Sequence, residues 1–155
     1  MDFQQYKNTV AIHDFLPHRA PMLLVDLILE LNDLEVKTIF QINEDTLFVE
    51  NNVLAEAGLI ENAAQTCSSI VAKGYFLDEN NEDKEGVKVI GFISGIKKLK
   101  VHHLPEVGQT IFTHATLGSR YDCPDYSICT ILCKTFYEDK LLFEAEINLF
   151  IQEEK

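Results

Sequence analysis

Residues 53–77 read VLAEAGLIENAAQTCSSIVAKGYFL, and this is the one stretch of the chain whose spacing predicts a long helix. Apolar residues recur in it at steps of three or four, including Leu54, Ile60, Cys67 and Val71, and the many alanines favour helix formation. Its other face is also apolar. A helix that is apolar nearly all round is buried rather than lying on the surface. We therefore expect a sheet to wrap it.

The segments on both sides of this helix have the patterns of β-strands. A short helical turn is expected over Thr9 to Leu16, ended by Pro17. Two apolar runs follow, Met22 to Leu31 and Val36 to Ile42, and the polar Asn32-Asp33 turn between them indicates a hairpin. After the helix and a polar loop over 78–86, four longer alternating runs predict antiparallel strands, the last two joined by a tight turn at 138–140: Val87 to Lys100, Gln109 to Leu117, Ser127 to Tyr137 and Leu141 to Ile151.

The order of these elements predicts a fold class. One buried helix after a hairpin, followed by four long strands, gives an α+β protein in which a curved antiparallel sheet wraps a long central helix. That architecture is the hot-dog fold. No repeat or flexible linker divides residues 1–155, so we expect a single domain. Sheet edges of this kind are commonly protected by pairing, and a homodimer or higher homo-oligomer is therefore expected.

Charge and hydropathy exclude several classes of protein. A net charge of −12 argues against a nucleic-acid binder, whose surface must neutralise phosphates. Asp26 and Glu30 interrupt the most apolar run, so no segment approaches the roughly 20 apolar residues that span a bilayer. Asp2, Gln4 and Gln5 stand where a signal peptide carries basic residues followed by an apolar block. We expect a cytoplasmic protein.

The cysteines do not predict a metal site or a disulfide framework. No two of them stand at the two-residue spacing of a zinc site, and no histidine lies near them in sequence. Cys129 and Cys133 share one face of a predicted strand, which favours packing in the core. Cys67 lies on the buried helix, where packing is also the better interpretation. We expect reduced thiols and no bound metal.

Glu61 is the strongest candidate for chemistry. A carboxylate among apolar neighbours is costly unless it lies near a cavity or accepts hydrogen bonds, and burial would raise its pKa into the range that suits proton transfer. The first-turn N–H groups of Ala57, Gly58 and Leu59 could polarise a carbonyl oxygen. A glutamate there could equally cap the helix. Gln65, one turn on, could hold Glu61 in place or bond a backbone group.

The densest basic patch of this acidic chain comprises Lys97, Lys98, Lys100, His102 and His103. It could contact an acidic carrier or a phosphorylated cofactor. It could equally be a solvated strand face followed by a turn before the proline at 105.

The run from Phe15 to Asp26, FLPHRAPMLLVD, closely resembles the opening of the 3-hydroxyacyl-acyl-carrier-protein dehydratases of fatty-acid synthesis, the FabZ type. The segment LIENAAQ at 59–65 is similar to the helix in which that family carries its catalytic acid and an Ala-Gln pair. The segment GFISGIKKLK at 91–100 resembles the following strand, and the stretches at 105–109 and 143–146 also fit. The resemblance covers nearly the whole chain in the right order.

The resemblance implies dimers with a substrate tunnel at the interface, which admits an acyl chain on the phosphopantetheine arm of an acyl carrier protein. No cofactor of the protein's own is implied. Glu61 takes the role of the carboxylate that acts on the leaving 3-hydroxyl. The substrate-binding positions are then Gly58, Leu59, Gln65, Ser94 and Gly95, and the carrier-docking positions are Lys97, Lys98 and Lys100.

One departure from the family pattern affects the chemistry. The family has a His-Phe-Pro-Gly loop whose histidine removes the C2 proton, whereas residues 48–54 read FVENNVL here. The chain more closely resembles the ApeP-like subunits of aryl polyene pathways, which share the Pro-His-x-x-Pro-Met opening and the Glu-x-x-Ala-Gln helix and can pair with a second hot-dog subunit. We therefore expect Glu61 to work with His18, or with a histidine from a partner chain.

Three functions fit these observations. The first is a dehydratase of 3-hydroxyacyl thioesters in fatty-acid, polyene or polyketide-type synthesis, alone or in a hetero-oligomer. The second is an acyl thioesterase, because hot-dog thioesterases activate water with a helix carboxylate and need no histidine. The third is a non-catalytic acyl-binding subunit. The opening motif, which thioesterases generally lack, favours the dehydratase.

Overall fold

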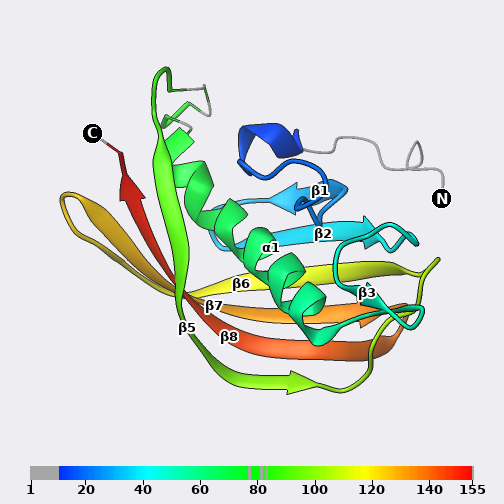
Figure 1. Cartoon of the computed structure of the whole chain (residues 1–155). Coiled ribbons are helices and arrows are strands. Elements are labelled where there is room, and N and C mark those ends of the chain that lie inside the picture. Colours follow the sequence, from blue (N-terminus) through cyan, green and yellow to red (C-terminus); the bar gives the residue numbers. More distant parts are fainter. Residues whose placement is uncertain (1–10, 77, 81, 83, 155) are drawn as a thin grey trace.

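A six-stranded antiparallel sheet curves around one long helix (Figure 1). The computed structural model describes residues 11–154 other than 77, 81 and 83. Across the sheet the strands follow the order β1-β2-β6-β7-β8-β5, so β1 and β5 form its two edges. The predicted α+β hot-dog fold is confirmed.

The elements follow the predicted sequence order, with one additional small hairpin. They are η2 (Ile12–Asp14), β1 (Leu27–Leu31), β2 (Glu35–Gln41), β3 (Val49–Glu50), β4 (Val53–Leu54), α1 (Glu56–Phe76), β5 (Val89–Val101), β6 (Thr110–Asp122), β7 (Tyr126–Tyr137) and β8 (Lys140–Glu153). The hairpins β1–β2 and β7–β8 and all four long strands are confirmed. Of the expected first helical turn, Thr9 and Val10 lie outside the described residues, as do Leu77, residues 81 and 83 of the polar loop, and residues 2–5.

The helix begins three residues later than the periodicity predicts. Asn51 and Asn52 have positive φ angles of 51° and 67°. Asparagine tolerates this conformation, and two such residues form a tight turn between antiparallel strands. The turn pairs β3 with β4, so Val53 and Leu54 are strand residues, and the prediction that the helix starts at Val53 is wrong.

The first strand is also shorter than predicted. Residues 22–26 are not in a strand, because their backbone bonds to helix side chains: Gln65 accepts from the Leu24 N–H and donates to the Met22 carbonyl. Asp26 accepts the Gln41 N–H at 2.7 Å. Burial raises the pKa of Asp26, and this hydrogen bond lowers it by less.

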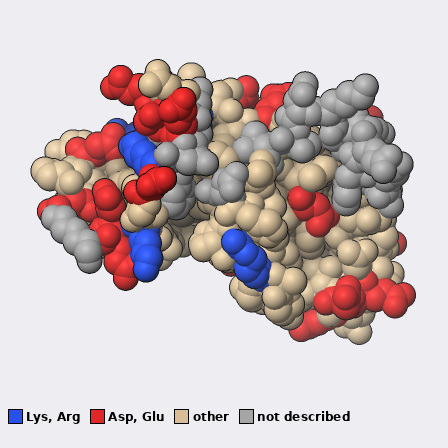
Figure 2. All heavy atoms as spheres, turned by 90° about the horizontal axis from the view of Figure 1, so that it is seen from above, with Lys and Arg blue, Asp and Glu red and all other residues tan. Residues whose placement is uncertain are grey.

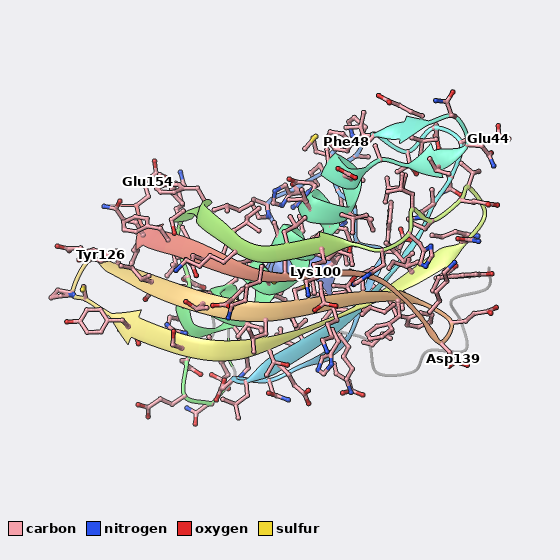
Figure 3. The ribbon with its side chains drawn as sticks, turned by 90° about the horizontal axis from the view of Figure 1, so that it is seen from below. Glu44, Phe48, Lys100, Tyr126, Asp139 and Glu154 are labelled. Carbon is pink, nitrogen blue, oxygen red and sulfur yellow. The ribbon has the colours of Figure 1, made fainter. Side chains whose placement is uncertain are left out.

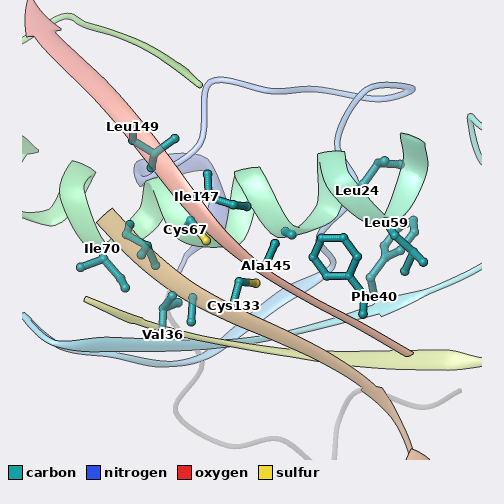
Figure 4. Packing of buried hydrophobic residues seen from close by; sticks show 14 of the residues in the cluster. Leu24, Val36, Phe40, Leu59, Cys67, Ile70, Cys133, Ala145, Ile147 and Leu149 are labelled. Atoms are coloured by element: carbon teal, nitrogen blue, oxygen red, sulfur yellow. The ribbon is translucent and has the colours of Figure 1, made fainter. Parts of the chain in front are cut away.

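The core lies between α1 and the concave face of the sheet (Figure 4). Helix residues Leu59, Cys67 and Ile70 pack there against strand residues such as Ile147 and Cys133. The expected burial of Cys67, Cys129 and Cys133 is confirmed. Burial, with the neighbouring Cys133, raises the pKa of the Cys67 thiol.

Buried polar side chains beneath the helix are paired with one another. The Thr113 hydroxyl donates to Asn62 Oδ1 at 2.7 Å and lies 3.0 Å from the Thr135 hydroxyl. The hydroxyls of Thr38 and Thr66 are 2.8 Å apart. These bonds fix the rotation of α1 over the sheet, because unpaired groups in the core would be costly. Within the described part of the chain, no helix is long and apolar enough to cross a membrane.

Candidate active site

A pocket of about 390 Å³ lies between α1, the segment before β1, and strands β5 and β8. The helix contributes one face, comprising Glu61, Ala64, Gln65, Ser68 and Ala72. The remaining walls are mostly apolar, with few polar groups beyond His13, His18 and the helix side chains. Apolar walls with a small number of placed polar groups are typical of small-molecule sites.

Glu61 and Gln65 form the polar centre of this pocket. Gln65 Nε2 donates to Glu61 Oε1 at 2.8 Å. The four-residue spacing along α1 brings the two side chains together, as expected from the sequence. The Glu61 side chain is 26% exposed, so it reaches the pocket rather than the core. Of the two roles left open for Gln65, the structure contains both: it holds Glu61 and bonds the backbone at Met22 and Leu24.

His18 lies across from Glu61 in the pocket. Its Nε2 atom is 3.8 Å from Glu61 Oε1, and its side chain is 32% exposed. The Nδ1 atom is buried and has no hydrogen-bond partner within the described part of the chain. The segment before β1 therefore brings to the carboxylate an imidazole that the loop at 48–54 does not supply.

The position of His18 depends on two amide side chains of α1. Asn62 Nδ2 donates to the Leu24 carbonyl at 2.7 Å, and Gln65 Oε1 accepts the Leu24 N–H at 2.8 Å. At the other end of the segment, Arg19 donates to the carbonyls of Leu16 and His18. The segment is thus fixed to the helix on one side of His18 and folded on itself on the other.

Two of the three expected helix N–H donors, those of Gly58 and Leu59, are already engaged. The N–H groups of Gly58 and Leu59 both donate to the Ala55 carbonyl, at 2.9 and 3.2 Å. The Leu59 side chain is fully buried in the core, and a side chain at Gly58 would collide with Leu54. Neither residue lines the pocket. Their part in substrate binding remains a prediction, and this geometry gives it no support.

Strand β5 lines the pocket through residues slightly earlier than expected. Val89, Gly91, Phe92 and Ile93 line it, whereas Ser94 and Gly95 do not. Gly95 pairs with Asn148 after a register shift between Ile93 and Gly95. Gly91 and Ala72 also line the pocket and were not among the residues expected from the sequence. Small residues at four-residue spacing on the helix, Ala64, Ser68 and Ala72, were the available signal.

The basic patch occupies the second half of β5 and the two residues after it, beside carboxylates. Lys98 forms an ion pair with Glu146 at 3.0 Å, and Lys100 pairs in register with Glu144. Lys100 lies near the middle of the sheet, away from Tyr126 and Asp139 at its two ends (Figure 3). Carboxylates gather at both ends of the molecule in Figure 2, and lysine and arginine are few on that face. The carrier-docking role of Lys97, Lys98 and Lys100 remains a prediction.

The other histidines lie elsewhere or are exposed. His102 Nε2 is 3.0 Å from a Glu144 oxygen, and His114 Nε2 is 2.7 Å from a Glu35 oxygen. Each contact lowers the pKa of its glutamate. Over the part of the chain that the structure describes, no three His, Cys, Asp or Glu side chains gather in a way that could hold a metal ion.

Sequence comparisons find dehydratases. The family model described as "ApeP-like: ApeP dehydratase" matches residues 10–155. A 3-hydroxyacyl-[acyl-carrier-protein] dehydratase FabZ of Rickettsia felis is 30% identical over 119 residues, which cover 73% of this chain and 77% of that protein. The FabZ of Lactobacillus helveticus is 26% identical over 155 residues, with 96% of this chain and 95% of that protein covered.

The fold recurs in a solved complex, the dehydratase heterocomplex ApeI:P from Xenorhabdus doucetiae. The TM-score is 0.75 with 16% sequence identity, and the match covers 94% of this chain and 93% of that chain. At this level of identity the likeness concerns the fold.

Proposed function

The chain belongs to the ApeP-like dehydratase family, and on that premise we propose that it dehydrates 3-hydroxyacyl thioesters with Glu61 and His18 as its acid and base. The observation that carries the proposal is the approach of His18 Nε2 to Glu61 Oε1, 3.8 Å, within one largely apolar pocket. The acyl group arrives on the phosphopantetheine arm of an acyl carrier protein.

The two side chains divide the elimination between them. His18 Nε2, unprotonated, takes the C2 proton of the substrate. Glu61, protonated, gives its proton to the 3-hydroxyl as the C3–O bond breaks, and water leaves with a double bond formed between C2 and C3. Elimination of this kind requires both a base and an acid.

The same two side chains must exchange a proton before the next turnover. After water leaves, His18 carries a proton and Glu61 is a carboxylate. Transfer of the Nε2 proton of His18 to the Glu61 carboxylate, whose Oε1 atom is 3.8 Å away, returns both groups to their starting states. Gln65 keeps the receiving oxygen in place through its 2.8 Å hydrogen bond.

We also propose that a second hot-dog subunit lies along β5. This strand is an edge of the sheet and pairs with β8 alone. Phe92 is 52% exposed and Ile90 46% exposed on it, although a long apolar edge normally requires a cover. The pocket opens beside the same strand, so a neighbour there would close it. The neighbour is either a second copy or a different subunit, as in the ApeI:P heterocomplex.

The test is interconversion of 3-hydroxyacyl and trans-2-enoyl groups on carrier protein, followed in both directions by mass spectrometry. Glu61→Gln keeps the shape of the side chain and should abolish interconversion. Glu56→Gln is the matched control, because Glu56 is exposed in the first turn of the same helix and does not line the pocket. It should retain the parent rate.

Two results would overturn the proposal. Release of free acid by the parent protein, lost in Glu61→Gln, would identify a thioesterase. No conversion in any direction, with a co-purified hot-dog partner present, would identify a non-catalytic acyl-binding subunit.

A further inference from the structure

The pocket follows the helix well beyond the polar centre. Ala64, Ser68 and Ala72 continue the face of α1 that carries Glu61, at four-residue spacing. Between Glu61 and Ala72 the helix rises by about 16 Å. Over this length the helix presents no side chain larger than serine to the pocket apart from Gln65, which lies beside Glu61.

The opposite wall is open at Gly91. This residue lies on β5, pairs with Ile151 of β8, and faces the helix side of the sheet. A Cβ there would meet Ile151 side-chain carbons at 3.5 and 3.6 Å and the Phe150 carbonyl oxygen at 3.8 Å, all ordinary contacts. No helix atom is nearer than these, so a side chain at position 91 would project into the cavity.

Glycine is an unusual choice inside a long strand. It weakens the strand, and its presence often marks a place where another group approaches closely. No positive φ requires it at position 91, so the backbone itself accepts other residues. The absence of a side chain at position 91 therefore enlarges the pocket.

We propose that the small residues Gly91 and Ala72 set the depth of the pocket, which therefore accommodates linear acyl chains of about a dozen carbons. A fully extended chain advances about 1.2 Å per bond, so about 16 Å accommodates a chain of that length. The walls along it are apolar, including Val89, Leu149 and Ile151. The inference rests on the proposed handling of acyl thioesters in this pocket.

Ser68 marks a second, shorter distance along the same face of α1. It lies about 10 Å along the helix from Glu61, compared with about 16 Å for Ala72. A large side chain at position 68 should therefore stop chains of about eight carbons. Gly91 lies toward the Ala72 end, because its strand partner Ile151 accepts a hydrogen bond from Tyr75. A large side chain at position 91 should therefore stop only chains within two or three carbons of the parent limit. This order of lengths is specific to a chain that runs along α1.

The experiment measures binding of S-alkyl pantetheine thioethers, from hexyl to hexadecyl, by isothermal titration calorimetry. These probes cannot be dehydrated or hydrolysed. Affinity should rise about fourfold for each methylene that enters the pocket and then level off. The proteins are the parent chain, Gly91→Val, Ser68→Leu, and Gln152→Val as the matched control. Gln152 is exposed, pairs with Ile90 and does not line the pocket.

The expected result is a plateau at about dodecyl for the parent and the control, a shorter one for Gly91→Val, and the shortest for Ser68→Leu. Equal plateaus in all four proteins, or a uniform loss at every length in a folded variant, would overturn the inference. Failure of the proposed dehydratase is visible separately, because enoyl formation would be absent while the binding plateaus kept their order.

Discussion

Gln65 joins helix α1 to the segment that carries His18, and its replacement by leucine should show the strength of that connection. Gln65→Leu nearly conserves volume but leaves the buried Leu24 N–H without its acceptor and the Met22 carbonyl without its donor. A buried unpaired donor costs about 1–3 kcal/mol, and the partly buried carbonyl adds a smaller cost. We expect a loss of about 2–3 kcal/mol, equivalent to a fall in Tm of roughly 4–12 °C in a domain of this size.

Urea denaturation followed by circular dichroism measures this loss, with an unchanged m value expected. Ser68→Ala is the control, because it removes one hydrogen bond to a helix carbonyl and no bond between elements. It should cost less than about 1 kcal/mol. A loss in Gln65→Leu no larger than in Ser68→Ala would refute the reasoning, because the segment would then be held by something other than Gln65.

Two further predictions follow from buried ionisable groups. Burial raises the pKa of Asp26 above its ordinary value of 3.8, so the native state keeps its proton to higher pH than the unfolded chain, and stability falls as pH rises through that interval. Asp26→Asn keeps an acceptor for the Gln41 N–H. In urea titrations its free energy of unfolding should therefore rise relative to that of the parent as the pH increases from 3.8 to neutrality. A difference in the free energy of unfolding that does not change with pH would contradict this. Cys67 is fully buried, and its thiol has a raised pKa. Iodoacetamide should therefore modify the half-buried Cys123 in the native protein and leave Cys67 unmodified until urea is added. Modification of Cys67 in the native protein, detected by mass spectrometry, would contradict its packing in the core.

Most of the fold follows from patterns that act locally. The 3.6-residue period of α1 and the alternation in the four long strands each specify a buried face, so the wrapped helix is predictable from residue spacing. The hairpin at Asn51-Asn52 is not, because its short strands carry too few residues to show a period. Residues 22–26 look like a strand by composition, but the side chains of Asn62 and Gln65 bond their backbone from 38 or more residues away.

The site was predictable in part for a similar reason. Glu61 stands out because a carboxylate is rare on an apolar helix, and its four-residue spacing to Gln65 fixes their contact. The approach of His18 to Glu61 depends on the path of a loop, which residue spacing does not encode. The sequence motif named His18 as one of two alternatives, and the loop path places it at 3.8 Å. Gly91 was missed because its effect is an absence of atoms.

The central claim is that Glu61 and His18 act together, and a double-mutant cycle on kcat/KM tests it most directly. The proteins are Glu61→Gln, His18→Gln, the double variant, and His103→Gln as an exposed control outside the pocket. Each single change in the pair should lower kcat/KM by a factor of about 10²–10⁴. The kcat/KM of the double variant should be only slightly below that of the less active single variant, because the two groups serve one reaction. A folded His18→Gln protein that dehydrates at the parent rate would contradict the claim and leave the base to His13 of the same pocket or to a histidine of a partner chain.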